Sequence, residues 1–141
     1  MHVSSITVFE RIRGYSMLWR AADQGRRPAI EAARVAYFNA ARRVRSVDTA
    51  TALLAGEIAA LVPDPPTPPK RLHRLAESRT ERLARWRFDG IIAATALVTG
   101  MTLIHNNPGD FEAIRSSIET DPERFSHVGS LNLIRCGVIG A

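Results

Sequence analysis

The stretch FDGIIAATALVTGMTLIHNNPGDF, residues 88–111, decides the fold. Residues 90–99 are apolar or small on every side, so a helix here is expected to be buried all round. Gly100 follows, where a helix end favours a left-handed residue, and residues 101–104 form a short apolar run typical of a buried strand. Residues 107–109 have the composition of a turn. This succession, with a further helix after the turn, predicts part of a parallel α/β sheet.

Two carboxylates bracket this unit. Asp89 is expected at the start of the buried helix, and Asp110 is expected to cap the helix that follows the turn. In open parallel sheets, ligands bind outside the carboxyl ends of the strands, and Asp110 would lie there. His105, at the strand end beside Asn107, is a further polar candidate, although an isolated histidine more often has a packing role.

The composition indicates one soluble domain. The chain has 141 residues, of which 45% are hydrophobic and 23% charged, and a chain of this length can bury a sizeable core. Its longest uncharged apolar stretch, residues 90–104, is shorter than the roughly 20 residues of a membrane span, and the first residues lack the pattern of a signal peptide. The single cysteine, Cys136, excludes an internal disulfide and fits a reducing cytoplasm. No zinc-ligand spacing and no glycine-rich phosphate loop is present.

The net charge of +5 is unevenly distributed. Residues 11–45 and 70–87 are strongly basic, whereas residues 88–141 carry more acids than arginines. A basic surface beside an acidic end suits a polyanion held near a metal-binding carboxylate cluster. The RNA-contact candidates are three arginines of the second basic segment: Arg79, Arg82 and Arg85. The alternative is that the arginines are only solvated helix faces.

The first half of the chain predicts a helical hairpin. A strand is expected over residues 3–6, then a helix that starts near Thr7, where Thr7 and Glu10 match the capping-box pattern. Glu10 is then a cap rather than a catalytic residue. A second amphipathic helix is expected from Pro28. Core packing is the expected role of the hairpin's aromatic residues, and an oligomer or partner surface is the alternative.

The middle of the chain predicts a helix, a connector and a second, basic helix. Asp48 is expected to cap the first of these helices, which follows a short strand. The proline-rich segment 63–69 is expected to be a stiff connector. Residues 70–87 are expected to be helical with the arginines pointing outward, and residues 131–134 are expected to form a final strand.

Three segments together resemble the PIN-domain ribonucleases, especially the VapC-like toxins of toxin–antitoxin pairs. Residues 88–96, FDGIIAATA, are similar to the family's D-x-x-I-A-A-x-A helix. Residues 103–111, LIHNNPGDF, are similar to its L-V-T-x-N-x-x-D-F strand and loop, with His105 at a position usually held by Thr or Ser. Residues 3–10, VSSITVFE, resemble its second strand leading to an essential glutamate. The order of the segments agrees with the family across most of the chain.

The resemblance implies an α/β/α sandwich around a mostly parallel sheet, formed by residues 1–141 as a single PIN-like domain. It implies a divalent cation, Mg²⁺ or Mn²⁺, bound by Glu10, Asp89 and Asp110, with Asn107 as a fourth catalytic residue. The metal would activate water for hydrolysis of RNA. The implied partners are an RNA substrate, a cognate antitoxin and a second copy of the chain in a homodimer. The connector 63–69 and the Arg-rich helix 70–87 have no family counterpart and are interpreted as an insertion.

The family's first strand, which is central in the sheet and ends in Asp-x-Asn or Asp-x-Ser, has no counterpart in the sequence. A translation start placed too far downstream would explain this, and so would decay of a toxin gene. The function expected is therefore an endoribonuclease, possibly incomplete. The alternatives are an inactive remnant that oligomerises or binds an antitoxin, and a nucleic-acid-binding module without chemistry.

The family assignment carries a test of architecture. The three carboxylates should converge on one metal ion. Six apolar residues in or directly beside the matched segments should be buried: Ile6, Ile91, Ile92, Leu97, Leu103 and Ile104.

Overall fold

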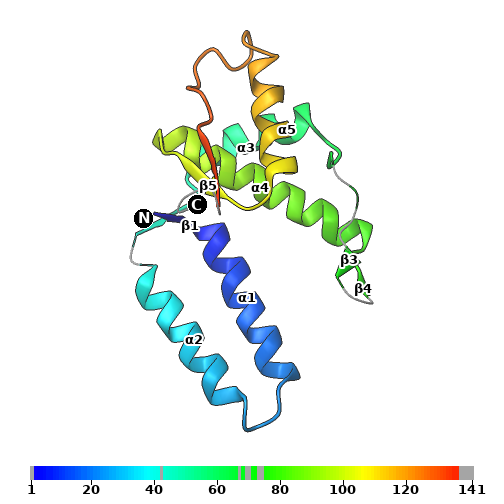
Figure 1. Cartoon of the computed structure of the whole chain (residues 1–141). Helices are drawn as coiled ribbons and strands as arrows, with labels where there is room; N and C mark the ends of the chain where they lie inside the picture. Colours follow the sequence, from blue (N-terminus) through cyan, green and yellow to red (C-terminus); the bar gives the residue numbers. More distant parts are fainter. Residues whose placement is uncertain (1, 42, 67, 69–70, 73–74, 137–141) are drawn as a thin grey trace. The chain divides into compact units, whose positions relative to one another are not determined.

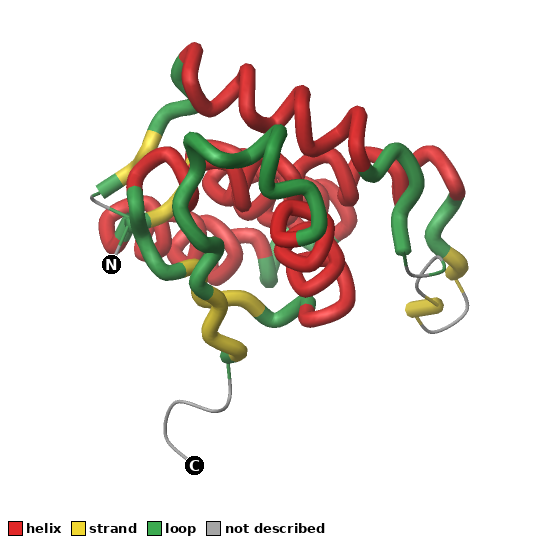
Figure 2. Tube along the Cα trace, turned by 90° about the horizontal axis from the view of Figure 1, so that it is seen from above, coloured by secondary structure: helices red, strands yellow, loops and turns green. Residues whose placement is uncertain are grey.

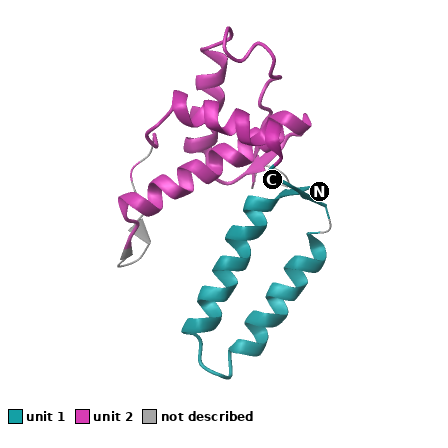
Figure 3. Ribbon diagram, turned by 180° about the vertical axis from the view of Figure 1, so that it is seen from behind, with its two compact units in different colours: residues 1–47 teal, residues 48–141 magenta. Residues whose placement is uncertain are grey.

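The computed structural model describes residues 2–41, 43–66, 68, 71–72 and 75–136. The chain is mixed α/β, dominated by helices with short strands between them (Figure 2). Its contacts divide it into two compact units, residues 1–47 and 48–141, which Figure 3 colours separately. Each unit is described by itself.

Unit 1 is the predicted helical hairpin joined at its ends by two short strands (Figure 1). Its elements are β1 (Val3–Ser4), α1 (Ser5–Ala21), α2 (Arg27–Ala40) and β2 (Val44–Arg45). β1 pairs with β2 in parallel. Among the described residues, neither helix has a fully buried side chain. The rings of Tyr15 and Tyr37 lie 6.2 Å apart, and the guanidinium of Arg27 lies 4.3 Å from the Trp19 ring centre, so aromatic contacts join the two helices.

The start of α1 corrects the predicted capping box. Ser4 is the N-cap, and its hydroxyl accepts a hydrogen bond from the Ile6 amide at 3.2 Å. The helix therefore begins before Thr7, so Thr7 and Glu10 both lie inside it.

The described residues of unit 2 form three helices and two pairs of short strands. Its elements are α3 (Thr49–Leu61), β3 (Arg71–Leu72), β4 (Leu75–Ala76), α4 (Arg79–Thr99), β5 (Leu103–His105), α5 (Pro108–Glu119) and β6 (Leu133–Arg135). β3 and β4 pair antiparallel, and β5 and β6 pair in parallel. The predicted cap of α3 is confirmed, because the Asp48 carboxylate accepts a hydrogen bond from the Thr51 amide at 2.8 Å.

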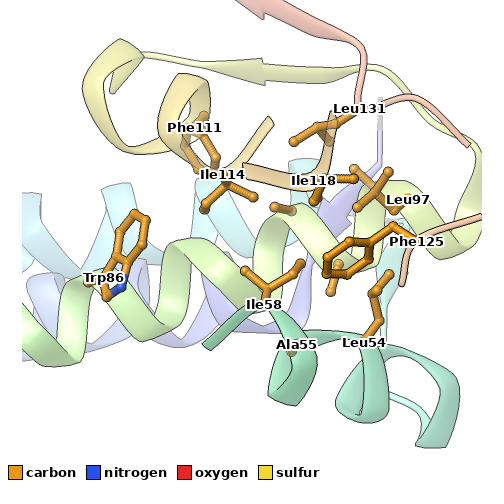
Figure 4. Close-up of a cluster of buried hydrophobic side chains, with 13 residues drawn as sticks. Leu54, Ala55, Ile58, Trp86, Leu97, Phe111, Ile114, Ile118, Phe125 and Leu131 are labelled. Carbon is orange, nitrogen blue, oxygen red and sulfur yellow. The ribbon is translucent and has the colours of Figure 1, made fainter. Parts of the chain in front are cut away.

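The core of unit 2 lies between α3, α4 and α5. Figure 4 shows side chains from these helices and from the segment after α5 gathered in one cluster, including Leu54, Ile58, Leu97, Ile114, Ile118 and Phe125. Trp86 closes one end of the cluster, and its indole N–H donates to the Val62 carbonyl oxygen at 2.9 Å. Burying aliphatic and aromatic surface from three helices is the main stabilising contribution in this unit.

The long helix α4 differs from the prediction in its start. Residues 70–87 were expected to be helical throughout, but the described residues before Ser78 form short strands or irregular structure. Ser78 and Glu81 make a capping box: the Ser78 hydroxyl accepts a hydrogen bond from the Glu81 amide at 3.1 Å, and the Ser78 amide donates to the Glu81 carboxylate at 2.8 Å. α4 then continues to Thr99 without a break, so Asp89 lies in its middle rather than at its start.

The cap at the far end of α4 agrees with the prediction, but the expectation that residues 90–99 are buried all round is wrong, because Val98 is 40% exposed. Gly100 has φ 65° and is the left-handed C-cap. Of the residues expected to be buried, Leu97 is buried, whereas Ile6, Ile91, Ile92 and Leu103 are only partly buried.

Ile104 corrects the predicted buried strand, because it is 48% exposed. Its register partner on β6, Ile134, is 40% exposed. Successive strand residues point to opposite faces. One face of the strand pair packs Leu103 toward the core, and the other face carries Ile104.

Candidate acidic site

α4 and the β5–α5 turn bring three of the predicted site residues together. Asp89 projects from the middle of α4, Asn107 is the N-cap residue of α5, and Asp110 lies in the first turn of α5. Asp89 and Asp110 are 7% and 0% exposed. The resemblance implied that Asp89 and Asp110 converge, and the structure brings these two carboxylates together through Asn107.

Asn107 connects the two carboxylates. Its Nδ2 donates to Asp89 Oδ2 and to Asp110 Oδ2, each at 3.0 Å. An amide nitrogen has two hydrogens, so both are used in this bridge. Asn107 therefore fixes the separation of two acidic groups that come from different helices. Asp110 was expected to cap α5, but the cap position belongs to Asn107.

Arginines of α4 balance the charge of Asp110. Arg82 Nη2 lies 2.7 Å from Asp110 Oδ1, and Arg85 Nη1 lies 3.3 Å from Oδ2. Arg85 also makes a bidentate ion pair with Glu77, with 2.8 Å from Nε to Oε1 and 2.9 Å from Nη2 to Oε2. Arg82, Arg85 and Asp89 are spaced three and four residues apart, so they share one face of α4. The cluster could have been predicted from this spacing in the sequence.

The electrostatics of Asp110 follow from these contacts. Burial, the largest influence, acts to raise the pKa of Asp110. Its hydrogen bonds with Asp89, Arg82 and Asn107 outweigh burial and hold the pKa below the usual aspartate value.

The three arginines proposed as RNA contacts differ in exposure. Arg79 is exposed, as expected for a solvent-facing residue. The outward orientation expected for Arg82 is wrong, because its side chain is 2% exposed and directed at Asp110. Arg85 is intermediate, with 20% of its side chain exposed. Helical periodicity failed here because a buried acid on another helix can hold an arginine inside.

Glu10 lies on α1 in unit 1 and is exposed. Its predicted meeting with Asp89 and Asp110 stays a prediction. Within the described part of the chain, no three His, Cys, Asp or Glu side chains gather as a ready metal site.

His105 lies beside this site, at the end of β5. It is 6% exposed and its ring packs 5.1 Å from the Phe111 ring, centre to centre. Burial lowers the pKa of His105. Glu112 opposes this effect, and Arg135 and Arg115 add to it. His105 thus has a packing role on the core side of α5.

Comparison with models of known protein families gives no match for this sequence, and comparison with curated proteins gives none either. In the described part of the chain, no helix combines the length and the apolar character of a membrane span.

Proposed function

We propose that this chain is a metal-dependent endoribonuclease of the PIN-domain, VapC-like toxin class, with an α/β/α fold around a mostly parallel sheet. The observation that supports the proposal is the Asn107 bridge between Asp89 and Asp110. Segments 88–96 and 103–111 each resemble the family. Their polar residues Asp89, Asn107 and Asp110 are joined by hydrogen bonds. The partners of such a protein would be an RNA substrate, a cognate antitoxin and a second copy of the chain.

The donor chemistry of the site fits a hard divalent cation. Asp89 and Asp110 offer buried carboxylate oxygens, which Mg²⁺ and Mn²⁺ prefer, and Glu10 is the proposed third ligand. A bound cation would supply an activated water and charge stabilisation at the phosphate.

The chain's own residues have two tasks in this proposal. Asn107 keeps the two carboxylates at a fixed separation through its bonds to both. Arg82 and Arg85 neutralise Asp110 while no cation is bound, which limits the repulsion between two buried acids. A cation bound at Asp110 would share this carboxylate with the two guanidinium groups and with Asn107.

The same arginine contacts favour a second candidate function. Both oxygens of Asp110 already bond to guanidinium groups, and a buried ion pair of this kind can have a purely structural role. In this alternative the protein is catalytically inactive and acts by oligomerising or by binding an antitoxin or RNA.

RNA cleavage and metal binding distinguish the two candidates. The full chain would be incubated with labelled RNA oligonucleotides in Mg²⁺ or Mn²⁺, with and without EDTA, while its melting temperature is followed. The nuclease predicts EDTA-sensitive cleavage and a rise in melting temperature with metal, because a ligand that binds only the folded state stabilises it.

Three variants complete this experiment. Asp89→Asn should abolish cleavage and the metal-induced stabilisation, and Glu10→Gln should weaken both. Glu119→Gln, at an exposed acid on α5, is the matched control and should leave both unchanged. Absence of metal-dependent cleavage and of metal-induced stabilisation would support the inactive alternative.

A further inference from the structure

The positive charge of the chain is concentrated in unit 1. Residues 1–47 hold nine arginines against three acids, a net charge of +6. Residues 48–141 hold ten basic residues against eleven acids, a net charge of −1. The net charge of +5 therefore arises from the helical hairpin, and a surface with an excess of one charge sign attracts a polyanion of the other.

The arginines of the hairpin have donors that those of α4 lack. Arg82 and Arg85 already make ion pairs inside unit 2. On α1, Arg13 and Arg20 are exposed, and neither forms an ion pair with another described residue. Their guanidinium groups can therefore donate to a ligand that arrives from solvent, and their planar forks match the oxygens of a phosphate.

These cations are distributed along α1. Arg13 and Arg20 are seven residues apart, which is two helical turns, so they lie on one face of the helix about 10 Å apart along its axis. Arg45 is the register partner of Ser4, the N-cap residue, and therefore lies beside the start of the helix. Arginines thus accompany the helix from its start toward its end, as contact with an extended phosphate backbone requires.

His2 reports the positive potential at the strand end of the hairpin. Burial lowers the pKa of His2, and the charges of Arg45 and Arg43 lower it further. Arg45 Nε also donates to His2 Nδ1 at 3.2 Å, which requires the neutral ring. An anion bound here would relieve the repulsion between these cations.

Exposed aromatic rings lie on the same two helices. Trp19 and Phe38 are 41% and 63% exposed. The guanidinium of Arg27 lies 4.3 Å from the Trp19 ring centre, so Phe38 offers the more accessible ring. Proteins that bind single strands combine a basic surface with aromatic rings on which bases stack. This combination favours single-stranded nucleic acid over an acidic polypeptide.

We propose that unit 1 binds single-stranded RNA through Arg13, Arg20 and Arg45, with Phe38 as a stacking surface for a base. RNA contact is thereby assigned to the helical hairpin rather than to α4. The choice of RNA as the polyanion rests on the proposed function, but the binding surface requires neither the acidic site nor a metal ion.

The probe is a labelled oligouridylate of about 12 nucleotides, within the usual site sizes for single strands. Its binding to the full chain is followed by fluorescence anisotropy in EDTA over a series of salt concentrations. Arg13→Gln/Arg20→Gln should raise the dissociation constant about fivefold for each arginine at about 0.1 M salt, and should reduce the salt slope by about 0.7 for each. Arg87→Gln/Arg124→Gln is the matched control, because it removes the same charge from two exposed arginines of unit 2, and it should leave the salt slope unchanged.

Two further measurements test the identity of the ligand. Phe38→Ala should raise the dissociation constant at least about fivefold without changing the salt slope, because stacking is not ionic, and unchanged binding would contradict the stacking contact. An oligoglutamate of matched charge should bind more weakly than the oligouridylate. Equally tight binding of the oligoglutamate would assign the surface to acidic proteins and overturn the proposal.

Equal losses of affinity in the two double variants, or the absence of saturable RNA binding, would also overturn the proposal. Binding is measured in EDTA, whereas the proposed nuclease is tested by cleavage in Mg²⁺ or Mn²⁺. Failure of one proposal is therefore distinguishable from failure of the other.

Discussion

Arg82 of α4 and Asp110 of α5 form a buried ion pair, with 2.7 Å between Nη2 and Oδ1 and side chains that are 2% and 0% exposed. The two residues are 28 positions apart in the chain. The pair joins α4 to α5, and its Asp110 belongs to the acidic site.

Removing one partner of this pair should destabilise unit 2. Arg82→Met removes the guanidinium closest to Asp110. Leaving a buried charge without its partner lowers the free energy of unfolding by about 3–5 kcal/mol. The double variant Arg82→Met/Asp110→Leu should recover most of this loss, because no charge is then left unpaired. Urea unfolding of the single and double variants would give the coupling free energy. If the losses in unfolding free energy of the two single variants sum to the loss of the double variant, the pair contributes no coupling free energy.

Asn107 should stabilise the two carboxylates that it bridges. Asn107→Ala removes two hydrogen bonds to acidic groups and should lower the free energy of unfolding by about 2 kcal/mol. Asn106→Ala, at the exposed neighbouring residue, is the control and should change it by less than about 0.5 kcal/mol. Equal effects of the two variants in urea unfolding would contradict the bridging role.

His105 should make unit 2 less stable in mild acid. Burial lowers the pKa of His105 below its ordinary value of 6.5, so the folded state favours the neutral ring. Its contribution to stability is complete above that ordinary value and is lost as the pH falls through the lower pKa of the folded state. Unfolding free energies of the unmodified chain and of His105→Gln, measured between about pH 8 and about pH 5, should converge toward acid pH. His127→Gln, at an exposed histidine, is the control and should retain the pH dependence of the unmodified chain. A constant difference between His105→Gln and the unmodified chain would exclude this contribution.

Two glycine variants should change stability in opposite directions. Gly100 has φ 65° with open space around it. Gly100→Ala introduces backbone strain but no steric clash, and it should lower the free energy of unfolding by about 1–2 kcal/mol. Gly56 lies inside α3, also with open space, and Gly56→Ala should stabilise the unit by about 0.8–1.0 kcal/mol. Thermal unfolding of the two variants measures both effects. A neutral result for Gly100→Ala would argue against its role as a left-handed cap.

Much of the local structure followed from the sequence because short-range chemistry decides it. The carboxylate of Asp48 and the missing side chain of Gly100 act on backbone groups a few residues away, and both caps formed as predicted. The start of α4 is also determined by short-range chemistry, since Ser78 and Glu81 have capping-box spacing. It was missed because the periodic apolar residues before it suggested a longer helix.

The convergence of Asp89 and Asp110 was predicted through the resemblance of their segments to one family, and the structure brings these two carboxylates together through Asn107. The inward direction of Arg82 and the exposure of Ile104 were decided only by the tertiary structure. Sequence patterns place charged residues at the surface and apolar runs in the interior because these are the average preferences over many proteins. A charged group is buried when a distant residue supplies its counter-charge. An apolar strand residue stays exposed when no neighbouring element covers its face, and both conditions depend on packing between segments far apart in the chain.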